Sequence, residues 1–214
     1  MIKTSLAVMA GAAAMTLLPV ADAFASSVDD PWLIRLRGLV VAPEEGGTTV
    51  PLGGDVDIDT SVVPELDISY FFTENFAVEA ILAVTPHDVA VNNSSIGDVD
   101  LGDVWLLPPT VLAQYHFNPR GSVRPYVGVG VNYTAFFNED EGPVADSIEY
   151  SDEFGWALQG GIDVPIGDGD WFANVDVKKL FLSTDVRVDA GGLIVVSDVD
   201  IDPWIVGVGV GRRF

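Results

Sequence analysis

The chain lacks cysteine, has few basic residues and, beyond residue 25, has no long uninterrupted apolar run. Without cysteine, neither disulfides nor thiolate metal sites can form, so the fold must be stable without covalent links. Ten basic residues stand against 32 acidic ones, which gives a formal net charge of −22. A field of that sign repels nucleic acid, so we expect no nucleic-acid partner.

The first residues have the pattern of an export signal. Lys3 supplies a positive start, residues 6–20 are mostly apolar, and Ala23-Phe24-Ala25 has the small-residue spacing of a cleavage site. The apolar stretch is short for the roughly 20 residues of a membrane helix. We therefore expect residues 1–25 to be a removed signal peptide and residues 26–214 to be one exported domain.

Apolar residues nevertheless make up 49% of the chain. Because they are dispersed, they fit strands that alternate between two environments. Eight stretches have this character, each long enough for the roughly 9 to 11 residues of a tilted membrane strand. They are residues 32–42, 58–72, 76–85, 105–117, 123–137, 154–165, 171–185 and 203–214.

Two kinds of connection alternate between these stretches. The short ones are residues 73–75, 118–122 and 166–170. The long ones, in or beside which many of the acidic residues lie, are residues 43–57, 86–104, 138–153 and 186–202. Short periplasmic turns alternating with long extracellular loops are typical of bacterial outer-membrane barrels. The sequence thus predicts an all-β fold, an eight-stranded antiparallel transmembrane β-barrel in the bacterial outer membrane.

Period-two alternation divides each predicted strand into two faces. Val127, Val129 and Val131 share one face, which suits lipid, while Gly128 and Gly130 take the other, which suits a narrow lumen. Membrane lipid and lipopolysaccharide are therefore expected partners. The terminal Phe214, behind alternating apolar residues, resembles the sorting signal through which barrels reach the outer-membrane assembly machinery.

Projecting the inward positions predicts a lumen that changes character along its axis. The inward charged residues near the periplasmic end balance five basic against five acidic side chains and suggest an ion-paired polar floor; they are Arg35, Arg37, Glu65, Asp67, Glu79, Arg124, Asp163, Asp176, Lys178 and Arg213. Nearer the extracellular end the inward positions become apolar, at Leu39, Val41, Val63, Ile81, Leu106, Leu180, Leu182 and Ile205. This is either an ordinary packed core or an apolar vestibule above a polar floor.

Prolines fall inside the two predicted strands that flank the third. Pro64 lies in the second and Pro108-Pro109 in the fourth. Proline cannot donate to a ladder, so we expect pairing to be broken on both sides of the third strand. The break is either a bulge without further meaning or a lateral opening toward lipid.

Residues for catalysis are not arranged in a usable pattern. No GxSxG elbow occurs, and Gly128-Val129-Gly130 lacks the spacing of a nucleotide loop. His87 and His116 belong to different segments with no third ligand at metal spacing. We expect no metal, no cofactor and no enzyme activity, although some small outer-membrane barrels are lipid-modifying enzymes.

A series of motifs resembles the outer membrane protein W (OmpW) family. They are Leu107-Pro108-Pro109-Thr110, Gln114-Tyr115-His116-Phe117, residues 125–133, Gly155-Trp156-Ala157, residues 200–204 and residues 209–214. The resemblance implies an eight-stranded barrel that admits small hydrophobic molecules and releases them sideways into the membrane. The resemblance also implies that Leu66 faces inward, whereas the alternation of the sequence turns it outward. Near the position of Lys178 the family would favour an aromatic residue, so this chain departs from the family pattern there.

Three further hypotheses remain beside this channel or carrier for a small hydrophobic ligand. The protein could be a structural or surface-interaction barrel whose lumen is only a packed core. It could be a lipid-modifying enzyme. A soluble, lipocalin-like binder is disfavoured by the apolar outward faces.

Overall fold

The computed structural model describes residues 28–44, 46–47, 53–95, 97–143, 147–167, 170–190 and 193–214. The predicted signal peptide, residues 1–25, lies outside the described residues and stays a prediction. Within the described ranges, no helix has the length and apolar character needed to cross a membrane.

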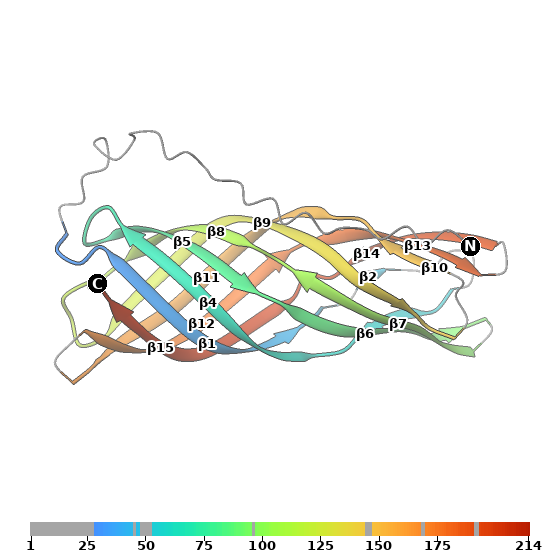
Figure 1. Cartoon of the computed structure of the whole chain (residues 1–214), viewed down its shortest axis with the longest axis horizontal. Helices are drawn as coiled ribbons and strands as arrows, with labels where there is room; N and C mark the ends of the chain where they lie inside the picture. The colour runs from blue at the N-terminus through green and yellow to red at the C-terminus, as the bar shows by residue number, and fades with distance from the viewer. Residues whose placement is uncertain are drawn as a thin grey trace, which may run out of the picture.

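Eight strands close into an antiparallel barrel, which confirms the predicted fold class (Figure 1). They are β1 (Trp32–Ala42), β4 (Ser61–Phe71), β5 (Phe76–Ala83), β8 (Thr110–His116), β9 (Arg124–Glu141), β11 (Glu153–Ile166), β12 (Trp171–Phe181) and β15 (Trp204–Arg213). Strand β9 pairs with both β8 and β11, so the ring closes. Beside the β1–β15 ladder, Trp32 and Phe214 exchange backbone hydrogen bonds of 3.0 and 2.8 Å.

The four long connections contain strands, so the prediction that they are loops was wrong. These strands are β2 (Gly46–Gly47), β3 (Asp55–Ile58), β6 (Thr85–Ser94), β7 (Gly97–Leu107), β10 (Ser147–Tyr150), β13 (Ser183–Ala190) and β14 (Leu193–Asp200). Strands β3, β6 and β7 form a sheet with the far part of β9, while β2, β10, β13 and β14 form a second sheet. We call both together the extracellular extension.

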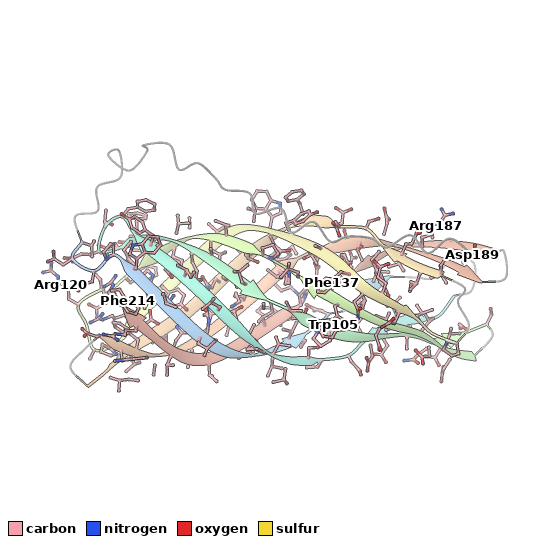
Figure 2. All side chains as sticks on the ribbon, in the orientation of Figure 1. Trp105, Arg120, Phe137, Arg187, Asp189 and Phe214 are labelled. Atoms are coloured by element: carbon pink, nitrogen blue, oxygen red, sulfur yellow. The ribbon has the colours of Figure 1, made fainter. Side chains whose placement is uncertain are left out.

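The extension follows the same period-two rule as the barrel. Val56 and Ile58 are buried, whereas the alternating Asp55 and Asp57 are exposed. Exposed carboxylates stay in water while the backbone between them pairs, so an acidic segment can still be a strand. The extension lies at the end of the molecule marked by Arg187, opposite the end marked by Arg120 and Phe214 (Figure 2).

Two predicted strands are divided in the structure. Pro108 and Pro109 separate the end of β7 from the start of β8, because neither residue has an N–H for the ladder. Leu182 separates β12 from β13, and its N–H donates to the Asp202 carboxylate at 2.8 Å instead of to a neighbouring strand. Each break marks the level at which the barrel passes into the extension.

The outer surface of the barrel is apolar and edged by aromatic residues. Its strands expose large apolar side chains, for example Leu36 at 59% and Val208 at 60% of their surface. Near the short connections Phe76 packs edge-on against Tyr115, with ring centroids 5.0 Å apart. Toward the extension Trp105 packs against Phe137 at 6.2 Å (Figure 2). An apolar band between two aromatic girdles is the pattern of a membrane barrel.

Among the described residues, the interior contains three apolar clusters at different heights along the barrel axis. A small one at the periplasmic end holds Leu33, Phe71, Ala77 and Phe172. A second lies in the upper barrel, and a third fills the extension. Leu66 is 40% exposed and faces outward, with the β1–β4 register continuous through Gly38 and Pro64. The alternation therefore gives the correct orientation of Leu66, and no bulge occurs at Pro64 on that side.

Candidate functional site

Arg35 is the first centre of the polar floor. The side chain is fully buried, and two of its nitrogens contact Asp163, with Nε–Oδ1 at 3.2 Å and Nη2–Oδ2 at 2.6 Å. Its Nη1 contacts Glu79 Oε1 at 2.7 Å and donates to Ser69 Oγ at 3.0 Å. One guanidinium from β1 thereby ties β4, β5 and β11 together across the lumen.

Arg37 and Lys178 form the second centre, one layer above. Arg37 Nε lies 2.7 Å from Asp67 and 2.9 Å from Glu65, and its Nη1 lies 3.1 Å from Asp176. Lys178 Nζ lies 2.7 Å from Glu65 and 3.0 Å from Asp176. The two cations therefore share two carboxylates, so neither carboxylate depends on a single partner.

The expected balance of five cations and five carboxylates does not hold within this buried network. Three cations face the five carboxylates. Arg124 and Arg213 are only partly buried and, among the described residues, form no ion pair. Each guanidinium lies instead over an aromatic ring, Arg124 over Phe172 at 4.9 Å and Arg213 over Phe71 at 4.0 Å. Arg124 is the first residue of β9 and Arg213 is the last residue of β15. Both arginines therefore belong to the periplasmic rim, the end of the barrel that carries the short connections.

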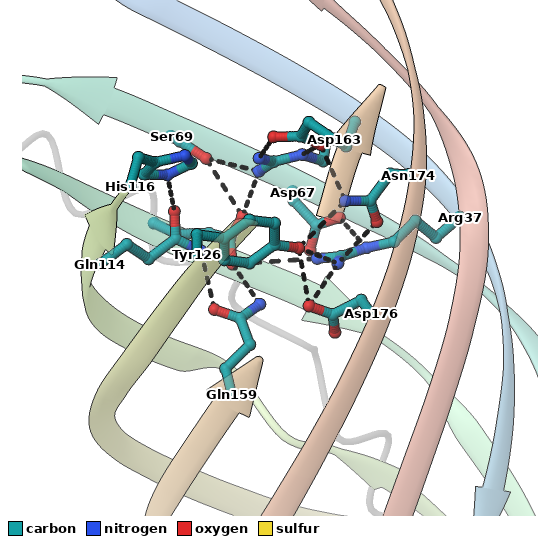
Figure 3. A network of polar contacts seen from close by, with 12 residues as sticks. Arg37, Asp67, Ser69, Gln114, His116, Tyr126, Gln159, Asp163, Asn174 and Asp176 are labelled. Atoms are coloured by element: carbon teal, nitrogen blue, oxygen red, sulfur yellow. Dashed lines mark hydrogen bonds and ion pairs between the residues drawn. The ribbon is translucent and has the colours of Figure 1, made fainter. Parts of the chain in front are cut away.

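Sequence reasoning missed Tyr126, the centre of the hydrogen-bond network (Figure 3). Its hydroxyl donates to Asp176 at 2.8 Å and accepts from Asn174 at 3.0 Å. A Cβ at Gly161 would lie 2.4 Å from the Tyr126 ring, so only glycine leaves room for it. Tyr126 occupies an inward position of β9, and that phase is the signal that could have found it.

The polar amides of the floor complete the network. Gln114 and Gln159 both donate to Glu79 Oε2, at 2.7 and 2.8 Å. His116 stacks on Tyr126 with ring centroids 5.0 Å apart. These charged and amide side chains fill the interior at this level, as expected for a barrel of eight strands.

Above the floor lies a cavity of about 40 Å³. Its wall is largely aliphatic, from Leu39, Val41, Ile81, Ala83, Leu106, Leu180, Leu182 and Ile205. Val63 belongs to the same apolar cluster without lining the cavity. A water molecule needs about 10 to 15 Å³ measured in this way, so the cavity as it stands in this structure has room for a few water molecules, and a larger solute has to widen it.

The apolar core of the extension lies above this cavity and shares residues with its wall. Leu106, Leu182 and Ile201 belong to that core and also line the cavity. Phe136 and Tyr150 stack beside them, with ring centroids 5.4 Å apart. A solute that came from the extracellular end would have to displace these side chains.

The prolines lie where strand pairing is interrupted. The β5–β8 ladder ends at Ile81 and Thr110, and the β6–β7 ladder begins at Thr85 and Leu106. Between these ladders Pro108 lines the cavity. We call this break, residues 82–84 opposite residues 107–109, the β5–β8 seam.

Pro64 lies at a second break. The β4–β5 ladder ends at Glu65 and Ala83, and pairing resumes between Ile58 and Val89. Pro64 itself faces outward and does not line the cavity. Pairing is therefore interrupted on both sides of the third barrel strand, as the prolines predict.

No grouping of three or more histidine, aspartate or glutamate side chains suited to a metal ion occurs among the described residues. The carboxylates of the floor are already bonded to guanidinium, ammonium and amide groups. These bonds point to a structural use of the charges at this level.

The family model for the OmpW family matches residues 31–214. The chain belongs to the OmpW family. The chain is 43% identical to an uncharacterized outer-membrane protein, y4mB, of Sinorhizobium fredii, over 96% of this chain and 90% of that protein. It is 36% identical to outer membrane protein W of Salmonella typhimurium, over 95% and 97%.

Solved structures agree with this assignment. The crystal structure of OprG from Pseudomonas aeruginosa matches with a TM-score of 0.81 at 28% identity, covering 88% of this chain and 98% of that one. The solid-state NMR structure of AlkL in lipid bilayers matches with a TM-score of 0.66 at 27% identity, over 87% and 90%. A Pseudomonas aeruginosa relative named as a dibenzothiophene metabolism operon protein, PahQ, is 28% identical over 87% and 90%.

The OmpW-family assignment establishes the setting of the barrel. The protein is an outer-membrane barrel, in contact with membrane lipid, as the alternating outward faces predict. Membership of this family agrees with the expectation that the chain is not an enzyme. The lipid-modifying enzyme and the soluble binder are thereby set aside.

Proposed function

We propose that this OmpW-family barrel carries small hydrophobic molecules from the extracellular side into the outer membrane and releases them sideways through the β5–β8 seam. The observation that carries the proposal is the aliphatic cavity above an ion-paired floor. A relative whose name places it in an operon for dibenzothiophene metabolism supports a small apolar solute.

The energetics favour entry to the cavity and oppose passage through the floor. Each Å² of apolar surface removed from water contributes about 25 cal/mol, so a solute gains by contact with Leu39, Ile81 and Leu180. Crossing the floor would break bonds among buried charges, which is costly. The solute therefore leaves sideways or returns.

The seam that borders the cavity is the favoured exit. Pro108 and Thr110 on one edge, with Ala83 on the other, line the cavity. Proline removes ladder donors there, so separating the strands breaks few hydrogen bonds. Pro64, on the far side of β5, serves as the comparison because it faces lipid.

Hydrocarbon binding and ion conductance test the proposal together. Purified barrel in phosphatidylcholine nanodiscs is expected to bind n-octane, and the same protein in planar bilayers is expected to conduct ions poorly. Replacing Leu180 or Ile81 by Asp should weaken octane binding without loss of the heat-dependent gel shift of a folded barrel. Steady, large conductance, or octane binding unaffected by both substitutions, would contradict a sealed carrier.

Transfer to lipid tests the exit. The double variant Pro108→Ala and Pro109→Ala restores two backbone donors and should slow the uptake of octane by lipid vesicles, with binding retained. Pro64→Ala is the matched control and should leave uptake unchanged. If Pro64→Ala slows uptake and the double variant does not, the exit lies on the other side of β5.

The structural-barrel hypothesis is favoured by one observation, the small size of the cavity under the apolar core of the extension. Under that hypothesis, widening the cavity has no functional effect. Under the carrier hypothesis, Leu182→Ala removes part of the cover and should increase the rate of octane binding. The two hypotheses therefore predict different results for one variant.

A further inference from the structure

One sector of the cavity wall is polar. Thr85 and His87 are two residues apart on β6, so both face inward, and they are only 4% and 5% exposed. Both line the cavity, whose wall is otherwise largely aliphatic. The carrier function proposed above has no use for polar groups at this place.

The other hydroxyl groups named here in the cavity wall already form hydrogen bonds, whereas the polar groups of Thr85 and His87 that face the cavity do not. Thr110 Oγ1 donates to Pro108 O at 3.0 Å, and Thr134 Oγ1 donates to Asn132 Oδ1 at 2.7 Å. Within the described part of the chain, neither the Thr85 hydroxyl nor His87 Nε2 has a hydrogen-bond partner. Two buried polar groups thus border the cavity with unused capacity.

The tautomer of His87 follows from its other nitrogen. His87 Nδ1 lies 2.8 Å from the backbone oxygen of Asp59. Because a carbonyl oxygen can only accept, Nδ1 carries the proton, and Nε2 of the neutral ring is an acceptor. The Thr85 hydroxyl can both donate and accept. The pair therefore offers one acceptor and one donor to the same space.

We propose that Thr85 and His87 form a subsite for a hydroxyl group, so that the solute is an apolar alcohol or phenol in preference to a plain hydrocarbon; this rests on the carrier function proposed above. One ligand hydroxyl satisfies both residues, because it donates to His87 Nε2 and accepts from Thr85. A ketone would leave Nε2 unpaired. A carboxylate finds no free donor except Thr85, since Lys178 is already bound to Glu65 and Asp176.

The subsite also sets the orientation of the solute. His87 is paired with Val104 on β7, beyond the Trp105–Phe137 contact, whereas Leu39 and Ile81 lie on the barrel side of the cavity. The hydroxyl is thus held at the extracellular end, and the apolar tail extends toward the floor.

Imidazole ¹⁵N NMR gives a direct test, because the chain contains only two histidines. Full-length mature barrel with ¹⁵N-labelled histidine, in phosphatidylcholine nanodiscs, is titrated with 1-octanol and with n-octane. The His87 Nε2 resonance should move with octanol and stay with octane. His116, whose Nε2 contacts Gln114 at 3.2 Å in the floor, is the internal control and should not move.

Calorimetry with variants supplies the second arm. One net hydrogen bond corresponds to about a fivefold preference for octanol over octane. Thr85→Val keeps the shape of the side chain and should remove most of that preference, while Thr134→Val, whose hydroxyl is already bonded, should keep it. Octanol and octane binding equally, with Nε2 unmoved, would mean that the subsite holds water only and would overturn the inference. Failure of both ligands to bind would instead overturn the carrier function.

Discussion

Replacing Arg35 by methionine removes the cation that two buried carboxylates share. Among the described residues, Asp163 has no other basic group within ion-pair distance, and Glu79 keeps only Arg37 Nη2 at 3.8 Å. Breaking a buried ion pair on one side costs about 3 to 5 kcal/mol, because the remaining charge is left without compensation. We therefore expect Arg35→Met to lower the free energy of unfolding by about that amount.

The same reasoning predicts a smaller loss for Lys178→Met. Its two carboxylates, Glu65 and Asp176, both keep Arg37 at 2.9 and 3.1 Å. The loss should be about 1.5 to 3 kcal/mol, the value of a hydrogen bond to a charged group. The order of the two variants thus tests the partner assignment as well as the presence of charge.

Urea unfolding of the barrel in lipid vesicles, followed by tryptophan fluorescence, measures both losses. Arg212→Met is the matched control, because Arg212 is exposed and lies over the Trp171 and Phe214 rings. Its loss should be about 0 to 1 kcal/mol. Adding Asp163→Asn to Arg35→Met should restore part of the stability. A loss below about 1 kcal/mol for Arg35→Met would refute a dry, paired floor.

Three further predictions concern other parts of the molecule. The Asp88 carboxyl, hydrogen-bonded to Asp103 on the exposed face of the extension, raises the pKa of Asp103. Because the pKa of this carboxyl is raised in the folded state, its contribution to stability is lost as pH rises from the ordinary carboxyl range through the raised value. Asp103→Asn should therefore raise the thermal midpoint at pH 7 but not at pH 3. Equal gains at both pH values would contradict this. Deletion of Phe214 should lower the amount of protein in the outer membrane while export stays intact. Immunoblots of membrane fractions that show an unchanged amount would count against recognition of Phe214 by the assembly machinery. Gly161→Ala should displace the Tyr126 ring and reduce the urea midpoint; near-UV circular dichroism like that of the unchanged chain would argue against the contact.

The barrel strands could be predicted because each has one lipid face and one lumen face. The predicted strand at residues 32–42 agrees with β1 at both ends. The alternation also predicts correctly that Leu66 faces outward, whereas the family resemblance implied an inward Leu66. The extension was missed because many of its outward residues are aspartates, such as Asp55, Asp57 and Asp88, which resemble a solvated loop in composition. Buried Val89 and Val91 on β6, two residues apart, held the signal for a strand.

Eight of the ten residues predicted for the floor lie in the buried network, but their pairing could not be predicted. Inward phase alone places Arg35 and Asp163 in the lumen, yet they are 128 residues apart in sequence. Which acid meets which base depends on the stagger between strands that closure imposes, and that stagger is not visible in a single strand. For the same reason Arg213 could not be assigned to the rim.

Strand β9 sets how far the molecule reaches beyond the bilayer. Its 18 residues run without interruption from the periplasmic rim into the extension. At about 3.3 Å per residue and a tilt of about 40°, it rises roughly 45 Å, against about 30 Å of hydrocarbon. The far end of the barrel therefore stands beyond the hydrocarbon of the outer leaflet, and under the carrier function proposed above a solute would enter the protein above the charged headgroups and avoid that barrier.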